Sequence, residues 1–223
     1  MVAHTGIAAT LLINGTTVHR KFGVPLDLNE GAKSSIDRNT EAGLNLINTD
    51  VIIWDEATMS DRRVYACVDR LLRDLMNSAE PFGGKILLLG GDWRQLLPVI
   101  RSSYDSRVAR YTLKLDRQLW PLFEQLKLTR NMRAEDPDGV YAKFLRLLGE
   151  GKRRKKDKDE FHSAMPSQIC VETEEEAIDF VYGDGALEDI DRVKDACILS
   201  TQNKDIMEIN ERVCSKFLVQ NSF

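Results

Sequence analysis

The sequence predicts an α/β fold built on a parallel β-sheet, and two apolar runs carry most of this prediction. The expected strands are Val51–Trp54 and Lys85–Leu89, and polar residues follow each one directly. Aliphatic runs without polar alternation are typical of strands that are buried on both faces, as in parallel sheets. Between them, apolar residues recur at helical spacing over Val64–Met76, and a Pro81–Gly84 turn follows. This order of elements forms a βαβ unit, whose crossover should be right-handed.

The N-terminal segment is expected to begin within a fold. Val2–Gly6 is typical of the end of a buried strand that leads into a helix at Ile7–Leu12. Gly15 then ends this helix, and Thr16 and Thr17 are placed to cap a short helix that runs through Phe22. Because a domain seldom opens on a buried strand, Met1 is interpreted as an internal methionine or the start of a partial gene model.

Residues 23–50 are polar and are expected to form an inserted loop or small subdomain with one helix at Ser34–Ile47. Ser60 is expected to cap the following helix. Further along, the sequence predicts a helix at Arg117–Phe123 with a buried Trp120, a third strand at Gln125–Leu128, a helix at Val140–Leu148, a strand at Ala196–Ser200 and a helix at Asn203–Phe217. A basic run at Lys152–Lys158 precedes an acidic stretch, and this shift in composition indicates a boundary or a solvated insertion.

Composition excludes few functions. The 223 residues are 43% hydrophobic and 30% charged, which is ordinary for a globular protein. The net charge of −4 gives no general attraction to nucleic acid, although a local basic groove would be enough to bind it. The four cysteines are widely spaced, which argues against a zinc site. The sequence contains neither an apolar run long enough to cross a bilayer nor a recognisable signal peptide, so no membrane partner is expected.

Chemically useful residues stand at both strand ends. Asp55 and Glu56 follow the first strand, and Gly91-Asp92-Trp93-Arg94-Gln95 follows the second. Ligands of open α/β sheets bind beyond the carboxyl ends of the strands. There Asp55 can hold Mg²⁺, Glu56 can take a proton from water, and Gln95 can hydrogen-bond a terminal phosphate. These residues predict a site that hydrolyses a nucleoside triphosphate.

The matching phosphate cradle does not occur in the sequence. A phosphate-binding loop has a glycine, four residues and then Gly-Lys-Ser or Gly-Lys-Thr. The two Gly-Lys pairs, Gly84-Lys85 and Gly151-Lys152, precede Ile86 and Arg153 and have no glycine at the required upstream spacing. The 223 residues therefore carry half of an ATPase site.

Several segments together resemble the PIF1-like DNA helicases, which are superfamily-one motors related to RecD. In chain order the matching segments are Thr5–Thr10 with Thr17–His19, Asp55–Ser60, Gly91–Pro98, Leu128–Arg133, Leu199–Asn203 and Asn210–Val213. Trp93 stands where phenylalanine is usual in this family. The sequence Asn131-Met132-Arg133 is most similar to that of the Helitron-type members found in eukaryotic genomes.

The resemblance implies a P-loop NTPase (RecA-like) fold, incomplete at both ends. Residues 1–130 would form the first motor domain without its phosphate-binding loop, and residues 131–223 a linker and the beginning of the second motor domain. By the same resemblance, Asp55 holds Mg²⁺, Glu56 activates water, Gln95 contacts the γ-phosphate, and Arg133 is an arginine finger. The residues expected to lie along single-stranded DNA are Thr5, Gly6 and His19.

The implied activity is ATP-dependent translocation from 5′ to 3′ and unwinding of DNA, with single-stranded and duplex DNA as partners, ATP as substrate and Mg²⁺ as cofactor. The implied setting is intracellular and nuclear, in DNA repair, recombination or telomere maintenance. Without the phosphate-binding loop, the chain alone is expected to be inactive.

Two other functions remain open: a P-loop ATPase without unwinding activity, and a non-catalytic remnant of a transposon-derived helicase that acts at most as a binding module. Each site residue also has a structural interpretation. These are a helix-capping pair for Asp55 and Glu56, a loop amide for Gln95, a structural imidazole for His19, a helix cap for Thr5, a salt bridge for Arg133 and a solvated loop for Lys152–Lys158.

Overall fold

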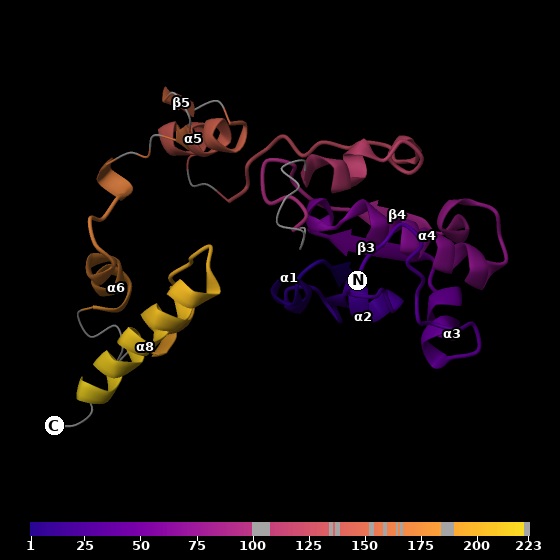
Figure 1. Ribbon diagram of the computed structural model, residues 1–223, viewed down its shortest axis with the longest axis horizontal. Coiled ribbons are helices and arrows are strands. Elements are labelled where there is room, and N and C mark those ends of the chain that lie inside the picture. Colours follow the sequence, from indigo (N-terminus) through magenta and orange to yellow (C-terminus); the bar gives the residue numbers. More distant parts are fainter. Residues whose placement is uncertain are drawn as a thin grey trace. The chain divides into compact units, whose positions relative to one another are not determined.

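The computed structural model describes residues 1–99, 108–133, 136, 139–151, 154–157, 160–163, 165, 167–183 and 190–220. The chain forms two compact units, Met1–Lys152 and Arg153–Phe223 (Figure 1). The sheet and all the predicted site residues belong to the first unit. The division expected after residue 130 stays a prediction.

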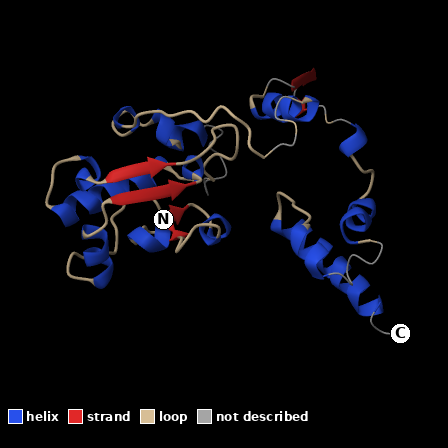
Figure 2. Ribbon diagram, turned by 180° about the vertical axis from the view of Figure 1, so that it is seen from behind, coloured by secondary structure: helices blue, strands red, loops and turns tan. Residues whose placement is uncertain are grey.

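A four-stranded parallel sheet organises the first unit, in the order β2-β1-β3-β4. The strands are β1 (Val2–Ala3), β2 (Thr16–Thr17), β3 (Val51–Asp55) and β4 (Ile86–Leu89), and β3 and β4 are the two long red arrows of Figure 2. Ala3 pairs with Asp55, and Trp54 pairs with Leu89. Because all four strands run in one direction, their carboxyl ends meet at one edge of the sheet, as the sequence predicts.

Short helices follow the strands, and their caps explain where they begin. The α-helices of this unit are α1 (Gly6–Thr10), α2 (Val18–Phe22), α3 (Glu41–Ile47), α4 (Arg62–Met76) and α5 (Val140–Gly149). The 3₁₀ turns are Ala57–Met59, Pro81–Gly84, Val108–Tyr111, Leu113–Leu115 and Trp120–Leu122. The hydroxyls of Thr5, Thr17 and Thr40 accept hydrogen bonds from backbone N–H groups in the first turns of α1, α2 and α3.

Aromatic stacking at the centre of the sheet anchors the core. Trp54 is fully buried, and its ring stacks on Tyr65 of α4 at 4.3 Å and on Phe22 of α2 at 6.2 Å. The apolar residues predicted on one face of α4 are buried as well, except for Met76, which is half-buried. Strand β4 differs from the prediction of burial on both faces, because Ile86 and Leu88 are 64% and 52% exposed.

Two predicted helix starts are wrong, and side-chain hydrogen bonds explain both. Ser34 donates to the Phe22 carbonyl at 2.6 Å and accepts from the Ile36 amide, so this serine forms a turn and the helix begins only at Glu41. Asp61, rather than Ser60, caps α4, since its carboxylate accepts a hydrogen bond from the amide of Arg63 at 2.8 Å.

The segment before the expected finger contains neither the predicted helix nor the predicted strand. Only Trp120–Leu122 forms a 3₁₀ turn, in which Pro121 has no N–H to donate. Leu119 is the buried residue, and Trp120 is half-buried. Residues 125–128 form no strand; Leu126 and Leu128 are 80% and 101% exposed, so neither side chain packs into a core.

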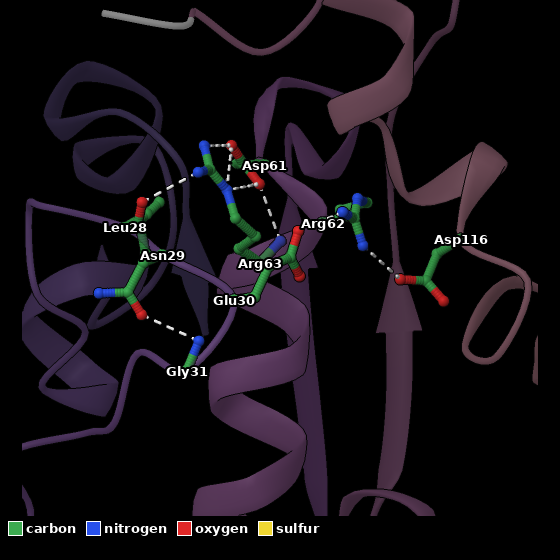
Figure 3. A network of polar contacts seen from close by, with 8 residues as sticks. All are labelled: Leu28, Asn29, Glu30, Gly31, Asp61, Arg62, Arg63 and Asp116. Atoms are coloured by element: carbon green, nitrogen blue, oxygen red, sulfur yellow. Dashed lines mark hydrogen bonds and ion pairs between the residues drawn. The ribbon is translucent and has the colours of Figure 1, made fainter.

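Charged residues in the first turn of α4 hold two distant loops (Figure 3). Arg63 pairs with Asp61 and donates to the Leu28 carbonyl at 2.9 Å. Its neighbour Arg62 lies 3.7 Å from the carboxylate of Asp116. The inserted segment 23–50 and the loop after residue 108 are therefore both attached to the helix that follows the Asp55–Ser60 segment.

The described residues of the second unit form a hairpin, a 3₁₀ turn and three α-helices. The elements are β5 (Arg154–Asp157), β6 (Glu160–Ser163), a 3₁₀ turn at Ser167–Ile169, α6 (Glu174–Tyr182), α7 (Ile190–Asp195) and α8 (Asn203–Gln220). Part of the predicted basic loop is thus the antiparallel strand β5, and Lys152 and Lys158 lie outside the described residues. The expected strand at 196–200 does not form, whereas the helix expected at 203–217 is confirmed. No helix in the described ranges is long and apolar enough to cross a membrane.

Candidate functional site

The loops that follow β3 and β4 are joined at the carboxyl edge of the sheet. The amide of Ala57 donates to the carbonyl of Gly90 at 2.8 Å, and the amide of Gly90 donates to the carbonyl of Trp54 at 2.9 Å. The Thr58 hydroxyl adds a longer contact of 3.4 Å to the carbonyl of Asp92. These bonds bring the Asp55–Glu56 segment and the Gly90–Gln95 segment together.

Two glycines allow this close approach. A Cβ atom on Gly91 would lie 2.9 Å from Thr58 Cγ2 and 3.1 Å from the Thr58 backbone nitrogen. A Cβ atom on Gly90 would lie 3.2 Å from Asp55 Oδ1. The Gly-Gly pair at the end of β4 is therefore a requirement of the packing between the two loops.

Asp55 and Glu56 are both half-buried at the end of β3. Asp55 Oδ1 accepts a hydrogen bond from the Glu56 amide at 2.9 Å. Glu56 has a left-handed backbone, with φ 49° and ψ 37°, which is unfavourable for a residue with a side chain. Its side chain makes no capping bond to the 3₁₀ turn that it precedes, which counts against the helix-capping interpretation for Glu56. Such backbone strain clusters at functional sites.

The Gly90–Gln95 segment is held by Asp92. Its Oδ1 accepts from the backbone nitrogen of Arg94 at 2.9 Å and from Nε of Arg94 at 3.0 Å. The hydrogen bond from the Arg94 side chain lowers the pKa of the Asp92 carboxyl. The backbone amide of Gln95 donates to the Asp92 carbonyl at 3.0 Å, and the Gln95 side chain is exposed. Gln95 therefore lies at the same edge of the sheet as Asp55 and Glu56.

The three residues expected to contact DNA follow the neighbouring strands β1 and β2. The Thr5 hydroxyl accepts from the Ala8 amide at 3.2 Å, so Thr5 caps α1. Gly6 is exposed, and no atom lies within 4 Å of a Cβ placed there. His19 is half-buried on α2, and burial lowers its pKa, which favours the neutral ring. All three follow the carboxyl ends of β1 and β2, and their role in DNA binding stays a prediction.

Arg133 is placed differently from the other predicted site residues. It is exposed, and its amide donates to Asn131 Oδ1 at 3.0 Å. Across the ranges that the structure describes, no hydrogen bond or ion pair joins Arg133 to the loops after β3 and β4. The same description contains no cluster of His, Cys, Asp and Glu residues suited to a metal ion.

Trp93 packs within the first unit. Its ring meets Trp120 edge-on at 5.7 Å, and Lys114 Nζ lies 5.9 Å from its centre. These contacts give Trp93 a packing role in the first unit.

The sequence interpretation missed a polar group next to the site, formed by the half-buried His4 and the buried Ser60 and Tyr65. His4 Nδ1 lies 3.1 Å from Ser60 Oγ, and the Tyr65 hydroxyl donates to the Ala57 carbonyl. The available signal was a histidine directly after a buried strand and a tyrosine among the core positions of α4.

Residues 1–159 match the family model described as PIF1-like helicase. The chain belongs to the PIF1-like helicase family. It is 29% identical over 154 residues to the ATP-dependent DNA helicase PIF1 of Emericella nidulans, a match that covers 68% of this chain and 20% of that protein. It is 34% identical over 99 residues to the ATP-dependent DNA helicase Pif1 of a Psychrobacter species, a match that covers 44% of this chain and 15% of that protein. The chain thus spans about a fifth or less of the length of these curated relatives.

Solved PIF1 structures share the fold. Bacteroides Pif1 in complex with ADP-AlF3 and ssDNA matches with a TM-score of 0.59 and 22% identity over 95% of this chain and 46% of that one. Bacteroides Pif1 in complex with ADP-AlF4 matches with a TM-score of 0.52 and 27% identity, over 71% of this chain and 37% of that one. The predicted α/β, RecA-like fold is confirmed. The finer likeness to Helitron-type members stays a prediction.

Proposed function

We propose that this chain forms part of the motor of an ATP-dependent DNA helicase. The observation that carries the proposal is the junction of the two strand ends, where the Ala57–Gly90 hydrogen bond brings two carboxylates near the segment that bears Gln95. Family membership supports it, since the curated relatives are ATP-dependent DNA helicases and a solved relative binds ADP-AlF4.

In this proposal each strand-end residue has one task. The Asp55 carboxylate, together with water and the β- and γ-phosphates of ATP, offers the oxygen ligands that Mg²⁺ prefers. The ion would supply positive charge to the phosphates when bound. Glu56 orients the attacking water and accepts its proton, and Gln95 hydrogen-bonds the γ-phosphate. Arg133 supplies a guanidinium to the charge that develops on the transferred phosphoryl group.

The DNA would lie across the neighbouring edge, along Thr5, Gly6 and His19. By family membership we further propose translocation from 5′ to 3′ on single-stranded DNA, unwinding of duplex DNA, and a nuclear role in repair, recombination or telomere maintenance. These finer roles rest on the family and on no contact within this chain.

A second candidate is a non-catalytic DNA-binding remnant of a helicase. We propose that the chain alone neither binds ATP tightly nor hydrolyses it, because backbone amides and a lysine of a phosphate-binding loop normally hold the phosphates. A chimaera separates the two candidates. In it, residues 1–159 replace the corresponding segment of PIF1 from Emericella nidulans. DNA-stimulated ATP hydrolysis by this chimaera would support a working motor segment, and a folded but inactive chimaera would support the remnant.

The DNA contact can be tested on the 223-residue chain itself. Fluorescence anisotropy with a labelled thymidine oligonucleotide at low salt should detect binding, and His19→Ala should weaken it. The matched control is His162→Ala, the same change in the second unit. An unchanged affinity in His19→Ala, or equal losses in both variants, would remove His19 from the proposed DNA path.

A further inference from the structure

A chain of polar side chains runs through the core beneath Glu56. Ser60 is 1% exposed and Tyr65 is 0% exposed. His4 Nδ1 lies 3.1 Å from Ser60 Oγ, and the Ser60 backbone amide and the Tyr65 hydroxyl both donate to the Ala57 carbonyl. Buried polar groups are costly unless they are hydrogen-bonded, and a satisfied network favours one geometry.

The protonation of the Tyr65 and His4 side chains suits these hydrogen bonds. Tyr65 uses its single proton on the Ala57 carbonyl. Burial and the nearby His19 lower the pKa of His4, which favours the neutral ring. Burial raises the pKa of Tyr65, which keeps its hydroxyl protonated.

The chain ends on the carbonyl of Ala57, the residue that follows Glu56. Ala57 is held on both sides, since its N–H donates to Gly90 at 2.8 Å and its carbonyl accepts from Tyr65. Glu56 stands just before it with a left-handed backbone, which persists only where the surroundings impose it. The strand register adds a second constraint, because Ala3, the residue before His4, pairs with Asp55.

We propose that His4, Ser60 and Tyr65 are positioning residues for Glu56, which fix the Ala57 carbonyl and thereby the left-handed backbone that aims the Glu56 carboxylate. This inference rests on the proposed role of Glu56 in ATP hydrolysis. None of the three side chains is required to touch the nucleotide.

The structural half of the inference is tested on the 223-residue chain by hydrogen–deuterium exchange. Tyr65→Phe removes only the hydroxyl and keeps the ring that stacks on Trp54. Exchange of residues 55–60 should become about two- to tenfold faster, the effect of losing one hydrogen bond. Exchange of α4 should stay unchanged. Tyr111→Phe is the matched control, because the Tyr111 ring contacts Arg63 instead. Unchanged exchange at 55–60, or an equal rise in α4, would overturn the inference.

Substitutions at His4 provide a second check that does not alter the core tyrosine. Asparagine can place an N–H donor near the position of Nδ1, whereas leucine cannot. His4→Asn should therefore keep slow exchange at residues 55–60, and His4→Leu should lose it. Equal behaviour of the two variants would contradict a role for the hydrogen bond between His4 and Ser60.

The catalytic half is tested in the chimaera. Tyr65→Phe should lower kcat by up to about a hundredfold, the cost of a misplaced group, and leave KM for ATP unchanged. In a Glu56→Gln background the same change should cost nothing further, because its effect passes through Glu56. Wild-type kcat in Tyr65→Phe would overturn the inference. If the unsubstituted chimaera is inactive, the proposed function fails, while the exchange experiment still decides the positioning.

Discussion

The backbone amide of Ala57 donates a 2.8 Å hydrogen bond to the carbonyl of Gly90. This bond joins the residue after Glu56 to the residue after β4. Together with the bond from the Gly90 amide to Trp54, it continues the pairing of β3 and β4 beyond their ends. The site is therefore an extension of the sheet, and its geometry depends on how closely the two loops can approach.

Gly91→Ala tests that approach. The added Cβ would lie 2.9 Å from Thr58 Cγ2 and 3.1 Å from the Thr58 nitrogen, and a backbone atom cannot move aside easily. We expect a loss of about 1–3 kcal/mol in the free energy of unfolding. Urea unfolding followed by tryptophan fluorescence measures it, since Trp54, Trp93 and Trp120 all belong to the first unit.

Gly31→Ala is the matched control for this substitution, because the nearest atom to its Cβ would be Asn29 Oδ1 at an ordinary 3.5 Å. It should change the urea midpoint little. A Gly91→Ala protein as stable as the Gly31→Ala protein would show that the two loops separate without cost.

The stability of the first unit should fall in mildly acidic solution. Burial lowers the pKa of both His4 and His19 below the usual 6.5, and the charge of His19 adds to the effect at His4. Below that value the unfolded chain binds more protons than the folded one, so the free energy of unfolding decreases as the pH falls. Above about pH 6.5 this contribution to stability is complete.

Urea midpoints at about pH 7.5 and about pH 5.5 measure this dependence in a window dominated by histidine. Replacement of both His4 and His19 by asparagine should remove most of the difference. A difference of the same size in the double variant would assign the pH dependence to other groups.

The elements that the sequence predicts correctly are those whose local signals agree with their packing. The helical periodicity of α4 matches its buried face. In the apolar run at Val51–Trp54, Ile52 and Trp54 are buried, whereas Val51 is 48% exposed. The Thr5 and Thr17 caps form where the sequence places them. In each case propensity, pattern and burial favour the same structure.

The secondary-structure predictions are wrong where a segment has no partner to pack against, or where a side-chain hydrogen bond competes with the predicted structure. The apolar residues of segment 125–128 are typical of a strand, yet the segment pairs with nothing in the described chain. A helix is expected to start at Ser34, but the Ser34 hydroxyl donates a hydrogen bond to the Phe22 carbonyl instead. His4 and Ser60 lie 56 positions apart in the sequence, and the local signals at His4 and Tyr65 do not show that these residues meet.

The proposed role of Arg133 as an arginine finger is the least constrained of the assignments. If its guanidinium contacts the transferred phosphoryl group, Arg133→Ala in the chimaera should slow hydrolysis by about 10³–10⁵ and weaken ATP binding far less. Arg133→Lys should not restore the rate, because lysine keeps the charge but loses the forked donors.

Arg130→Ala is the internal control for this assignment, three residues earlier in the same exposed segment. Steady-state ATPase assays with saturating DNA compare the variants. A loss in Arg130→Ala that equals or exceeds the loss in Arg133→Ala would mean that the finger has been assigned to the wrong residue.

The central claim is that the carboxyl edge of this sheet hydrolyses ATP, with Glu56 as the base. The most direct test is the DNA-stimulated ATPase rate of the chimaera with and without Glu56→Gln, measured together with ATP affinity. The amide matches the carboxylate in size but cannot accept a proton. We predict that ATP affinity is kept while turnover falls by at least about a hundredfold, the lower range for a general base. A Glu56→Gln chimaera that hydrolyses ATP at the unsubstituted rate would contradict the account.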